Sequence, residues 1–362
     1  MAQFDFVQTN FTRGELSPRL RSRIDFEGFF NGVQTLKNFI VLPLGGVMKR
    51  PGTKFVSEVA DSSKFHRLIP FEFSVAESYA LEFGNHTLRF YANGGQITTN
   101  TVTAAFSNPD FSNGLTGWSD ASNGTGAVSA VTDSGLLASS PQAAAKLTPD
   151  GSGNEAVVRQ SVSITETSTV HTLRISTDIL NGPKNQQMRL RVGSTAGGND
   201  VKERFLSAGQ HAIDVDPNGN GTLYFDIMAE FASASGEGLV YSVDFQSGQP
   251  LELETPYSEA DVNFLNWTQS ADVLFIGHPS NRPRELRRFG FAEFSLVPYD
   301  YRDGPYQDVN LTQTSLSANG VGGRVTLTAS STVGINGGVG FQDPSDLGRP
   351  IRVKVTESKN VK

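Results

Sequence analysis

Apolar and polar residues alternate with a period of two through much of this sequence, most clearly within residues 78–91. Every second residue from Tyr79 to Phe83 is a large apolar one, and the alternation resumes after Gly-Asn-His-Thr. Such alternation places apolar side chains on one face of a strand, and glycine and asparagine favour a turn. We therefore predict a β-hairpin here. The same reasoning adds a strand within 65–73 and a second turn at 92–95.

From residue 98 to 246 the chain is rich in Thr, Ala, Ser, Gly and Asn and contains short alternating runs. These runs lie at 155–164, 170–175, 188–192, 221–228 and 239–245. Turn-forming clusters such as Asp-Pro-Asn-Gly-Asn-Gly separate them, without helical periodicity between. Short strands at this spacing are typical of a β-sandwich or jelly roll. The predicted fold class is therefore mostly β.

Two changes in composition suggest the domain organisation. Phenylalanine and arginine are dense at first, sparse from 104 to 246, and dense again in 247–310. A β-rich host domain interrupted by an inserted β-sandwich accounts for this pattern, because insertions are tolerated at exposed turns. The prediction assigns 1–103 and 247–310 to the host domain, 104–246 to the insertion, and 311–362 to a further β segment.

Two segments fit a helix. Ser258 and Asp261 have the spacing of a capping box, and Val262 and Leu265 follow at a helical spacing. These residues predict one short helix. The second segment, 26–36, is weakened by its two glycines.

The 362 residues carry 30 Lys and Arg against 37 Asp and Glu, and the resulting net charge of −7 is unevenly spread. Residues 1–104 sum to +2, residues 105–246 to −7 and the remainder to −2. A dedicated nucleic-acid-binding domain normally shows a strong basic excess, so this class is disfavoured.

The chain contains no cysteine, which removes disulfide scaffolds, thiolate zinc sites, iron–sulfur clusters and cysteine nucleophiles. Its first residues lack the continuous apolar core of a secretory signal. The most apolar run, 39–48, is interrupted by proline and glycine and is too short to span a bilayer. We therefore expect a protein that is made in a cytoplasm and is not an integral membrane protein.

No catalytic or cofactor-binding motif is recognisable. The five histidines have no metal-binding spacing, and the nucleophile elbow, the P-loop and the dinucleotide-binding glycine motif are absent from the sequence. We expect no enzymatic activity, no cofactor and no metal. Residues 214–221 faintly resemble a calcium loop but lack its bidentate glutamate, so a polar turn is favoured over a calcium site.

Arg19, Arg21 and Arg23 alternate with other residues, which would place them on one face of an extended segment. They are candidates for contacts with phosphates or with an acidic neighbouring subunit. A second cluster is interpreted more simply as solvated charge beside Asp and Glu. Its members are Arg282, Arg284, Arg287 and Arg288.

Trp118 closes the stretch 108–118, and two roles are open for it. The indole could form a platform that stacks on a sugar, or it could anchor the core of the predicted sandwich. The core is favoured, because a large indole near the start of a short strand usually buries most of its area.

Several ordered stretches resemble the tail nozzle, or tail tubular B-like, proteins of short-tailed phages. Phe-Thr-Arg-Gly-Glu-Leu-Ser-Pro lies at 11–18, and Asn-Phe, Gly-Gly and Arg-Pro-Gly-Thr follow within 37–56. Glu-Thr-Pro-Tyr lies at 254–257, Gln-Ser-Ala-Asp-Val at 269–273 and Asp-Gly-Pro-Tyr at 303–306. The motif residues singled out are Gly45, Gly46, Arg50, Pro51, Gly52, Gln269, Asp272, Asp303, Gly304 and Pro305.

Physical reasons support some of these motif residues. The Gly-Gly and Pro-Gly pairs permit tight turns or positive-φ backbone. Arg50 can bond carbonyl groups or a carboxylate. Asp272 precedes an apolar run and fits a turn that leads into a buried strand.

The nozzle resemblance implies a structural virion protein. It implies a hexameric ring in the tail, assembled in the host cytoplasm, bound to adaptor and fibre proteins and enclosing the channel through which genomic DNA leaves. The DNA would pass without sequence-specific binding. The family usually continues beyond this length, so a shortened form or a fragment is expected. We further expect residues 10–23 to lie across a neighbouring subunit or an adjoining tail protein.

The predicted insertion is similar to the jelly rolls of carbohydrate-binding modules. The resemblance lies in Asn-Pro-Asp-Phe at 108–111 with Gly117 and Trp118, and in Tyr-Ser-Val-Asp-Phe at 241–245. It implies a host glycan as partner. A nozzle subunit is thus the leading prediction and a glycan-binding tail protein the alternative. A cell-wall hydrolase is disfavoured, because no nucleophile or acid–base set is recognisable.

Overall fold

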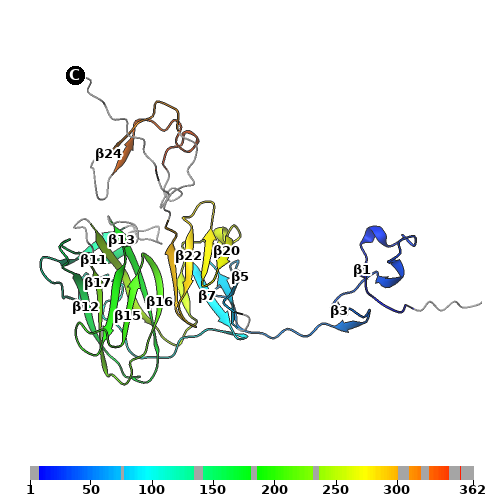
Figure 1. The fold of residues 1–362 in the computed structure, drawn as a ribbon, viewed down its shortest axis with the longest axis horizontal. Coiled ribbons are helices and arrows are strands. Elements are labelled where there is room, and N and C mark those ends of the chain that lie inside the picture. Colours follow the sequence, from blue (N-terminus) through cyan, green and yellow to red (C-terminus); the bar gives the residue numbers. More distant parts are fainter. Residues whose placement is uncertain are drawn as a thin grey trace, which may run out of the picture. The chain divides into compact units, whose positions relative to one another are not determined.

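The computed structural model describes residues 8–74, 77–133, 142–180, 186–230, 236–300, 310–318, 326–341 and 351. The chain divides into two compact units, one ending at Val56 and one beginning at Ser57 (Figure 1). We call them the N-terminal unit and the main unit. This division falls inside the predicted segment 1–103.

The N-terminal unit consists of very short elements. They are β1 (Gly14–Glu15), η1 (Pro18–Leu20), η2 (Phe29–Asn31), β2 (Gly32–Val33), β3 (Phe39–Val41) and β4 (Val47–Lys49). β1 pairs with β2 in parallel, and β3 pairs with β4 in antiparallel fashion. Among the described residues of this unit, Leu16 is the buried large apolar side chain.

Two expectations for this unit are wrong. The possible helix within 26–36 is only the 3-10 turn η2 followed by a strand, because glycines flank the turn on both sides. The arginine segment is not extended, because Pro18 begins the 3-10 helix η1. The backbone N–H of Arg23 donates to the Leu20 carbonyl (3.1 Å), so the alternate arginines do not share one face.

Strands dominate the main unit, which confirms the mostly-β fold class. A nine-stranded sheet has the order β10-β11-β18-β13-β16-β23-β22-β21-β20. Its strands are β10 (Ala127–Asp133), β11 (Gln142–Thr148), β18 (Glu237–Gln246), β13 (His171–Leu180), β16 (Gly209–Val215), β23 (Phe294–Pro298), β22 (Arg284–Arg288), β21 (Val273–Gly277) and β20 (Asn266–Ser270).

Two smaller sheets pack beside it. The five-stranded sheet contains, in order, β15 (Lys202–Leu206), β14 (Met188–Gly193), β17 (Thr222–Ala229), β12 (Ala156–Ser163) and β9 (Ser119–Asp120). The other, which we call the β5–β8 sheet, also has five strands, namely β19 (Glu252–Glu254), β7 (Thr87–Ala92), β6 (Ser78–Phe83) and β5 (Arg67–Glu72) in this order, with β8 (Gly95–Gln96) paired to β7.

Most predicted elements are present. The hairpin β6–β7 is confirmed, as is the turn after it, where Asn93 and Gly94 adopt positive φ angles of 53° and 72°. The five short runs correspond to β12, β13, β14, β17 and β18. The strands β10, β11, β15 and β16 were not predicted from the sequence.

Two hydrophobic cores use opposite faces of the nine-stranded sheet. The first lies between this sheet and the five-stranded sheet, and it includes Ile213 of β16 and Phe225 of β17. The second lies between β21–β23 and the β5–β8 sheet, and it includes Ala212 of β16. Because neighbouring residues of a strand point to opposite faces, β16 contributes to both cores.

The two ends of the predicted insertion meet. The backbone N–H of Val102 donates to the Ser247 hydroxyl (2.8 Å), and the N–H of Gly248 donates to the Asn100 carbonyl (3.0 Å). The nine-stranded sheet nevertheless crosses the predicted boundary, because β16 pairs directly with β23. The boundaries at 103/104 and 246/247 stay predictions.

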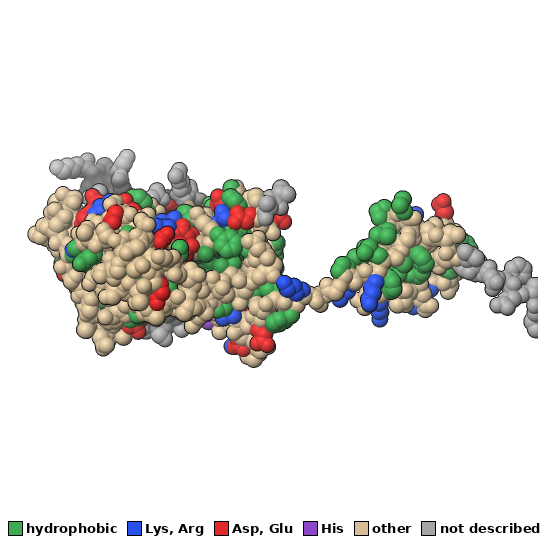
Figure 2. Space-filling view, turned by 90° about the horizontal axis from the view of Figure 1, so that it is seen from below, with side chains coloured by type: hydrophobic (Ala, Val, Ile, Leu, Met, Phe, Trp, Pro, Cys, Tyr) green, Lys and Arg blue, Asp and Glu red, His purple; other side chains and the backbone are tan. Residues whose placement is uncertain are grey.

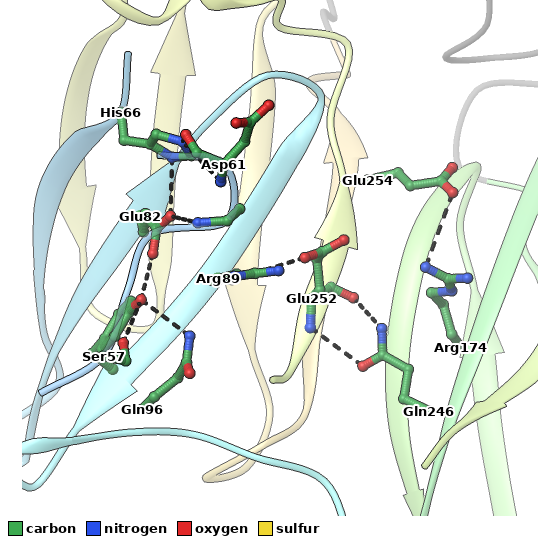
Figure 3. A network of polar contacts seen from close by, with 12 residues as sticks. Ser57, Asp61, His66, Glu82, Arg89, Gln96, Arg174, Gln246, Glu252 and Glu254 are labelled. Carbon is green, nitrogen blue, oxygen red and sulfur yellow. Dashed lines mark hydrogen bonds and ion pairs between the residues drawn. The ribbon is translucent and has the colours of Figure 1, made fainter. Parts of the chain in front are cut away.

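Polar side-chain contacts also join the predicted insertion to the host segments (Figure 3). Arg89 of β7 donates to the Glu252 carboxylate (2.8 Å), and the Gln246 side chain bonds both backbone groups of Glu252 (2.6 and 3.2 Å).

In the same network, buried Glu82 accepts hydrogen bonds from the Tyr91 hydroxyl and from the backbone of Ala60. These contacts hold the first residues of the main unit against its sheet.

The predicted short helix is present as α1 (Glu259–Val262). Both hydrogen bonds of its capping box form between Ser258 and Asp261. Farther along the chain lie β24 (Leu316–Ala318), β25 (Leu327–Ala329) and η3 (Asn336–Gly338). Among the described residues, no helix has the length and apolar character needed to cross a membrane.

Candidate functional site

An open cleft lies in the main unit where the five-stranded sheet ends and the nine-stranded sheet continues. The five-stranded sheet ends at β15, whereas the nine-stranded sheet continues past it to β23 and β22. Ser295 and Val297 of β23 alternate with the core residues Phe294 and Leu296, so they lie on the opposite face. They help to line a cleft of about 260 Å³. The space exists because no strand of the smaller sheet covers this part of the larger one.

His211 and Ser295 lie buried at the base of the cleft. Burial lowers the pKa of His211 to about 4, so its ring is neutral at pH 7. Its Nε2 faces the Ser207 carbonyl (2.9 Å) and therefore carries the proton, while Nδ1 accepts a hydrogen bond from the Ser295 hydroxyl (2.8 Å). The pair connects β16 to β23 across the predicted boundary.

Exposed aromatic rings lie at the rim. Phe205 of β15 is 59% exposed, and Phe289, which follows β22, is 48% exposed. The Arg204 guanidinium lies 3.3 Å from the centre of the Phe289 ring, a close cation–π contact. Gln187 donates a hydrogen bond to the Ser207 hydroxyl (3.0 Å), which adds two neutral polar groups to the lining. The cleft thus combines flat apolar surfaces with hydrogen-bonding groups.

Arg204 has an incomplete set of partners. Its Nη1 lies 4.0 Å from Glu293, beyond hydrogen-bond distance, while Glu293 itself pairs with Lys202. Burial lowers the pKa of Arg204, which remains charged at neutral pH. The carboxylate of Glu293 also accepts a hydrogen bond from the backbone of Asp214 (3.0 Å). Lys202 and Asp214 both contact Oε1 of Glu293, whereas Oε2 is the oxygen that lies 4.0 Å from Arg204.

The interpretation of the second arginine cluster as solvated charge is wrong. Arg284 is buried, and Arg288 stacks 4.0 Å from the Phe73 ring centre while pairing with Glu77 (3.0 Å). Arg287 reaches the cleft and pairs with Glu285 (2.7 Å). Strand alternation directs Arg284 and Arg288 onto the face of β22 that packs against the second core, and Arg287 onto the opposite face, towards the cleft.

The N-terminal unit has an unusually apolar surface. Figure 2 shows apolar side chains gathered on it. Its exposed large apolar residues include Ile24, Phe30, Phe39, Ile40, Leu44, Met48 and Phe55, and Leu44 is 98% exposed. Monomeric proteins rarely leave a contiguous apolar surface of this kind in water.

The three candidate interface arginines lie in this unit, and all are at its surface. Arg23 pairs with Asp25 (2.6 Å), and Arg21 donates to the Gln34 carbonyl (3.3 Å). Arg19 lies in η1 and is exposed. The predicted role of these arginines at an interface stays a prediction.

The nozzle motif residues in the N-terminal unit lie in and after the β3–β4 turn. Gly45 has a φ of +92°, whereas neither Gly46 nor Gly52 adopts a positive φ. Arg50, next to Pro51, donates to the side-chain carbonyl oxygen of Asn38 (3.1 Å), which agrees with the expected bond to a carbonyl group.

In the main unit the motif residues shape a second turn. Gln269 bonds the backbone of Glu72 through both ends of its amide (2.8 and 3.1 Å) and so ties β20 to the end of β5. Asp272 lies in the turn before the buried strand β21, as predicted. Asp303, Gly304 and Pro305 lie outside the described residues.

Trp118 belongs to the first core and is 7% exposed. Its ring lies 5.7 Å from that of Phe106 and 5.1 Å from that of Phe111, and its Nε1 donates to the Asn108 carbonyl (3.1 Å). A ring that is covered on this scale offers no open face to a sugar. Any sugar stacking must use other aromatic residues.

The segment with a faint calcium-loop pattern contains a local turn. Asp216 accepts a hydrogen bond from the backbone of Asn218 (3.0 Å), while Asp214 accepts one from the Thr172 hydroxyl (3.0 Å). Within the described ranges, no cluster of three or more His, Cys, Asp or Glu side chains could hold a metal ion.

The residues of the cleft were missed because they come from distant parts of the chain. Gln187 and Phe289 lie about a hundred residues apart and share no motif. The available signal was weak, namely the polar His211 and Ser295 two positions before the apolar Ile213 and Val297.

The sequence matches no protein-family model and no curated protein. Among solved structures, similarity is found to a CBM61 carbohydrate-binding module in complex with β-1,4-galactotriose, at 20% identity and a TM-score of 0.29, covering 38% of this chain and 94% of the module. A CBM27 module that recognises mannan matches at 13% identity and a TM-score of 0.25, covering 44% of this chain and 98% of the module.

A third match is the enzymatically active domain of tailspike protein 4 from bacteriophage CBA120, at 17% identity and a TM-score of 0.30. It covers 38% of this chain, and this chain spans 20% of that domain's length. At these TM-scores the likenesses define no function for the chain.

Proposed function

We propose that this protein is a phage tail protein that binds a glycan on the host surface through the cleft between β15 and β22–β23. The observation that carries this proposal is the cleft with exposed Phe205 and Phe289 beside Arg204, Gln187 and Ser207. Apolar walls with a few well-placed polar groups are characteristic of small-ligand sites. The assignment to a phage tail rests on the sequence resemblance to nozzle proteins.

The chemistry of the cleft suits a sugar ring. One face of a pyranose presents C–H groups that pack on an aromatic ring, and its hydroxyl groups need donors and acceptors at the edge. Phe205 supplies an exposed ring, and Gln187 and Ser207 lie in the same lining. The protein then acts as a binding module without catalysing a reaction.

A glycan array probed with the whole chain tests this function. Phe205→Ala should weaken retention about ten-fold or more, because aromatic anchors dominate binding at such sites. Phe264→Ala, at an exposed ring that does not line the cleft, is the matched control and should retain binding. No glycan retained, or retention that ignores Phe205→Ala, would contradict the proposal.

A second candidate function is that of a tail nozzle subunit, and the surface of the N-terminal unit favours it. Residues 1–56 carry a net charge of +4, whereas 57–362 carry −11. An apolar, positively charged unit is suited to docking on an acidic neighbour. We propose a ring, hexameric by resemblance, in the virion tail, contacting adaptor and fibre proteins and passing genomic DNA through its lumen.

Replacement of Arg19, Arg21 and Arg23 by Glu tests the second candidate. Rings seen by electron microscopy should disappear while the melting temperature stays nearly unchanged, because all three side chains lie at the surface of the unit. The matched control replaces Lys37, Lys49 and Lys54 by Glu, which changes the charge of the same unit equally. Rings that persist in the arginine variant would remove these residues from the interface.

A further inference from the structure

We infer that the cleft selects an acidic saccharide, a sugar that bears a carboxylate, and that Arg204 is the group that receives the carboxylate. This inference rests on the proposed glycan binding and adds the class of glycan. Three observations support it: the charges of the cleft lining, the partners of Arg204, and the neutral polar groups beside Arg204.

The lining is cationic within an acidic unit. Two arginines, Arg204 and Arg287, line the cleft, and no Asp or Glu of the described residues does so. The surrounding main unit carries a net charge of −11. A cleft of opposite sign to the rest of its unit favours an anionic ligand over a neutral or cationic one.

The two arginines differ in what they can still bind. Glu285 lies 2.7 Å from the Nε of Arg287 and accepts its hydrogen bond. Arg204 makes no hydrogen bond with any described residue, and its nearest carboxylate, that of Glu293, is 4.0 Å away. The charge of Arg287 is therefore matched by a hydrogen-bonded carboxylate, whereas Arg204 has none among the described residues and is the cation in this lining best able to receive the carboxylate of a ligand.

Stacking fixes the orientation of this guanidinium. Its centre lies 3.3 Å from the centre of the Phe289 ring. A guanidinium that rests on an aromatic face keeps its N–H groups in its own plane, where they match the two oxygens of a carboxylate. Arg204 is thus prepared for bidentate binding without a large loss of side-chain freedom on association.

The neighbouring groups favour a sugar as the carrier of the carboxylate. Phe205 offers a ring that is 59% exposed beside Arg204 in the lining. The Gln187 amide nitrogen donates to the Ser207 hydroxyl oxygen. The Gln187 amide oxygen can therefore accept a hydrogen bond from a ligand, and the Ser207 hydroxyl can donate one. An inorganic anion needs the charge alone, whereas a uronic or sialic acid uses the ring surface and the neutral groups as well.

Calorimetric titration of the whole chain tests the inference. The probes are oligogalacturonide, oligoglucuronide and sialyllactose, each paired with its carboxyl-reduced counterpart, with inorganic phosphate as a further ligand. At least one acidic form should bind about ten-fold or more tightly than its reduced counterpart, as expected for charge-assisted hydrogen bonds. Arg204→Gln should remove that difference, and Arg204→Lys should retain part of it.

Arg174→Gln is the matched control, because Arg174 lies on β13, outside the cleft lining, and should leave the preference intact. The melting temperature of each variant shows whether it is folded. Equal binding of acidic and reduced sugars, or a preference that survives Arg204→Gln, overturns the inference and leaves the glycan-binding function standing. Arg204-dependent binding of phosphate with no binding of any sugar overturns both. Sugar binding in neither form overturns the proposed function itself.

Discussion

At the residue scale, buried aromatic and polar side chains account for much of the stability of the first core. Trp118 is packed against Phe106 and Phe111 and also donates a hydrogen bond to the Asn108 carbonyl. The loss of this side chain removes both the buried area and the hydrogen bond, and it leaves a cavity that the rigid strands fill incompletely.

Trp118→Ala should therefore lower the free energy of unfolding by about 3–5 kcal/mol. Trp118→Phe keeps much of the packing and should cost less. Chemical denaturation followed by circular dichroism measures both values. Altered ligand binding with unchanged stability would instead identify Trp118 as an exposed stacking platform.

His211 should make stability depend on pH. Its folded-state pKa of about 4 lies below its ordinary value, because burial and the nearby Arg204 and Arg287 disfavour the imidazolium. As pH falls below about 6.5, His211 binds a proton in the unfolded chain, whereas in the folded protein it stays neutral until about pH 4. Stability is therefore retained above pH 6.5 and lost progressively between 6.5 and 4, by about 3 kcal/mol in total.

His211→Gln should remove this part of the pH dependence. Asp178, whose pKa burial raises to about 6, has an opposite effect between about pH 4 and 6, but it is common to both proteins and cancels in their difference. Urea unfolding at a series of pH values measures the free energies of unfolding. Parallel curves for the wild type and the variant between pH 7.5 and 4.5 would contradict the prediction.

At the element scale, local patterns determined hairpins and caps but not the neighbours of each strand. The β6–β7 hairpin and the capping box of α1 depend on residues a few positions apart, and both were predicted. β16 was missed because its polar His211 and Asp214 interrupt the apolar alternation. Its identity as a strand depends on β13 and β23 on either side of it.

Gly209 shows how closely β16 approaches β23. It has a φ of +140°, and a Cβ at this position would overlap the Leu296 carbonyl oxygen and lie 3.0 Å from the Cα of Val297. Gly94 also has a positive φ, of +72°, but has open space around it. Both glycines therefore have a positive φ, but only Gly94 has room for a side chain.

Gly209→Ala should therefore destabilise the protein by about 3 kcal/mol, because backbone strain and overlap add, against about 1 kcal/mol for Gly94→Ala. Thermal unfolding of both variants provides the comparison. Equal losses in the two variants would show that β16 can move away from β23 without cost.

At the scale of the whole molecule, the predicted insertion shares a sheet with its host. Residues 100–102 and 247–248 are hydrogen-bonded to each other, so a short linker can close the gap that a deletion leaves. The deletion also removes β16 from the edge of β23 and Lys202 from Glu293. The exposed edge of β23 is then available for pairing with another chain.

Deletion of 104–246 with a Gly/Ser link from Thr103 to Ser247 should leave a folded host domain that is less stable and more prone to self-association than the intact chain. Circular dichroism, thermal melting and size-exclusion chromatography measure these properties. Phe294→Ala in the intact chain provides a reference for damage to the second core. A remainder that misfolds as completely as a severe core variant would contradict the two-module organisation.

The amino-acid sequence by itself determined the mostly-β class, the positions of many strands, the short capped helix and the turns. Each of these depends on alternation, capping or turn chemistry among neighbouring residues. Only the tertiary structure decided that β16 joins β23, that one nine-stranded sheet serves two cores, and that Arg204, Phe289 and Ser295 meet at one cleft. Such pairings depend on which apolar faces bury one another across more than eighty residues, and no local spacing records that choice.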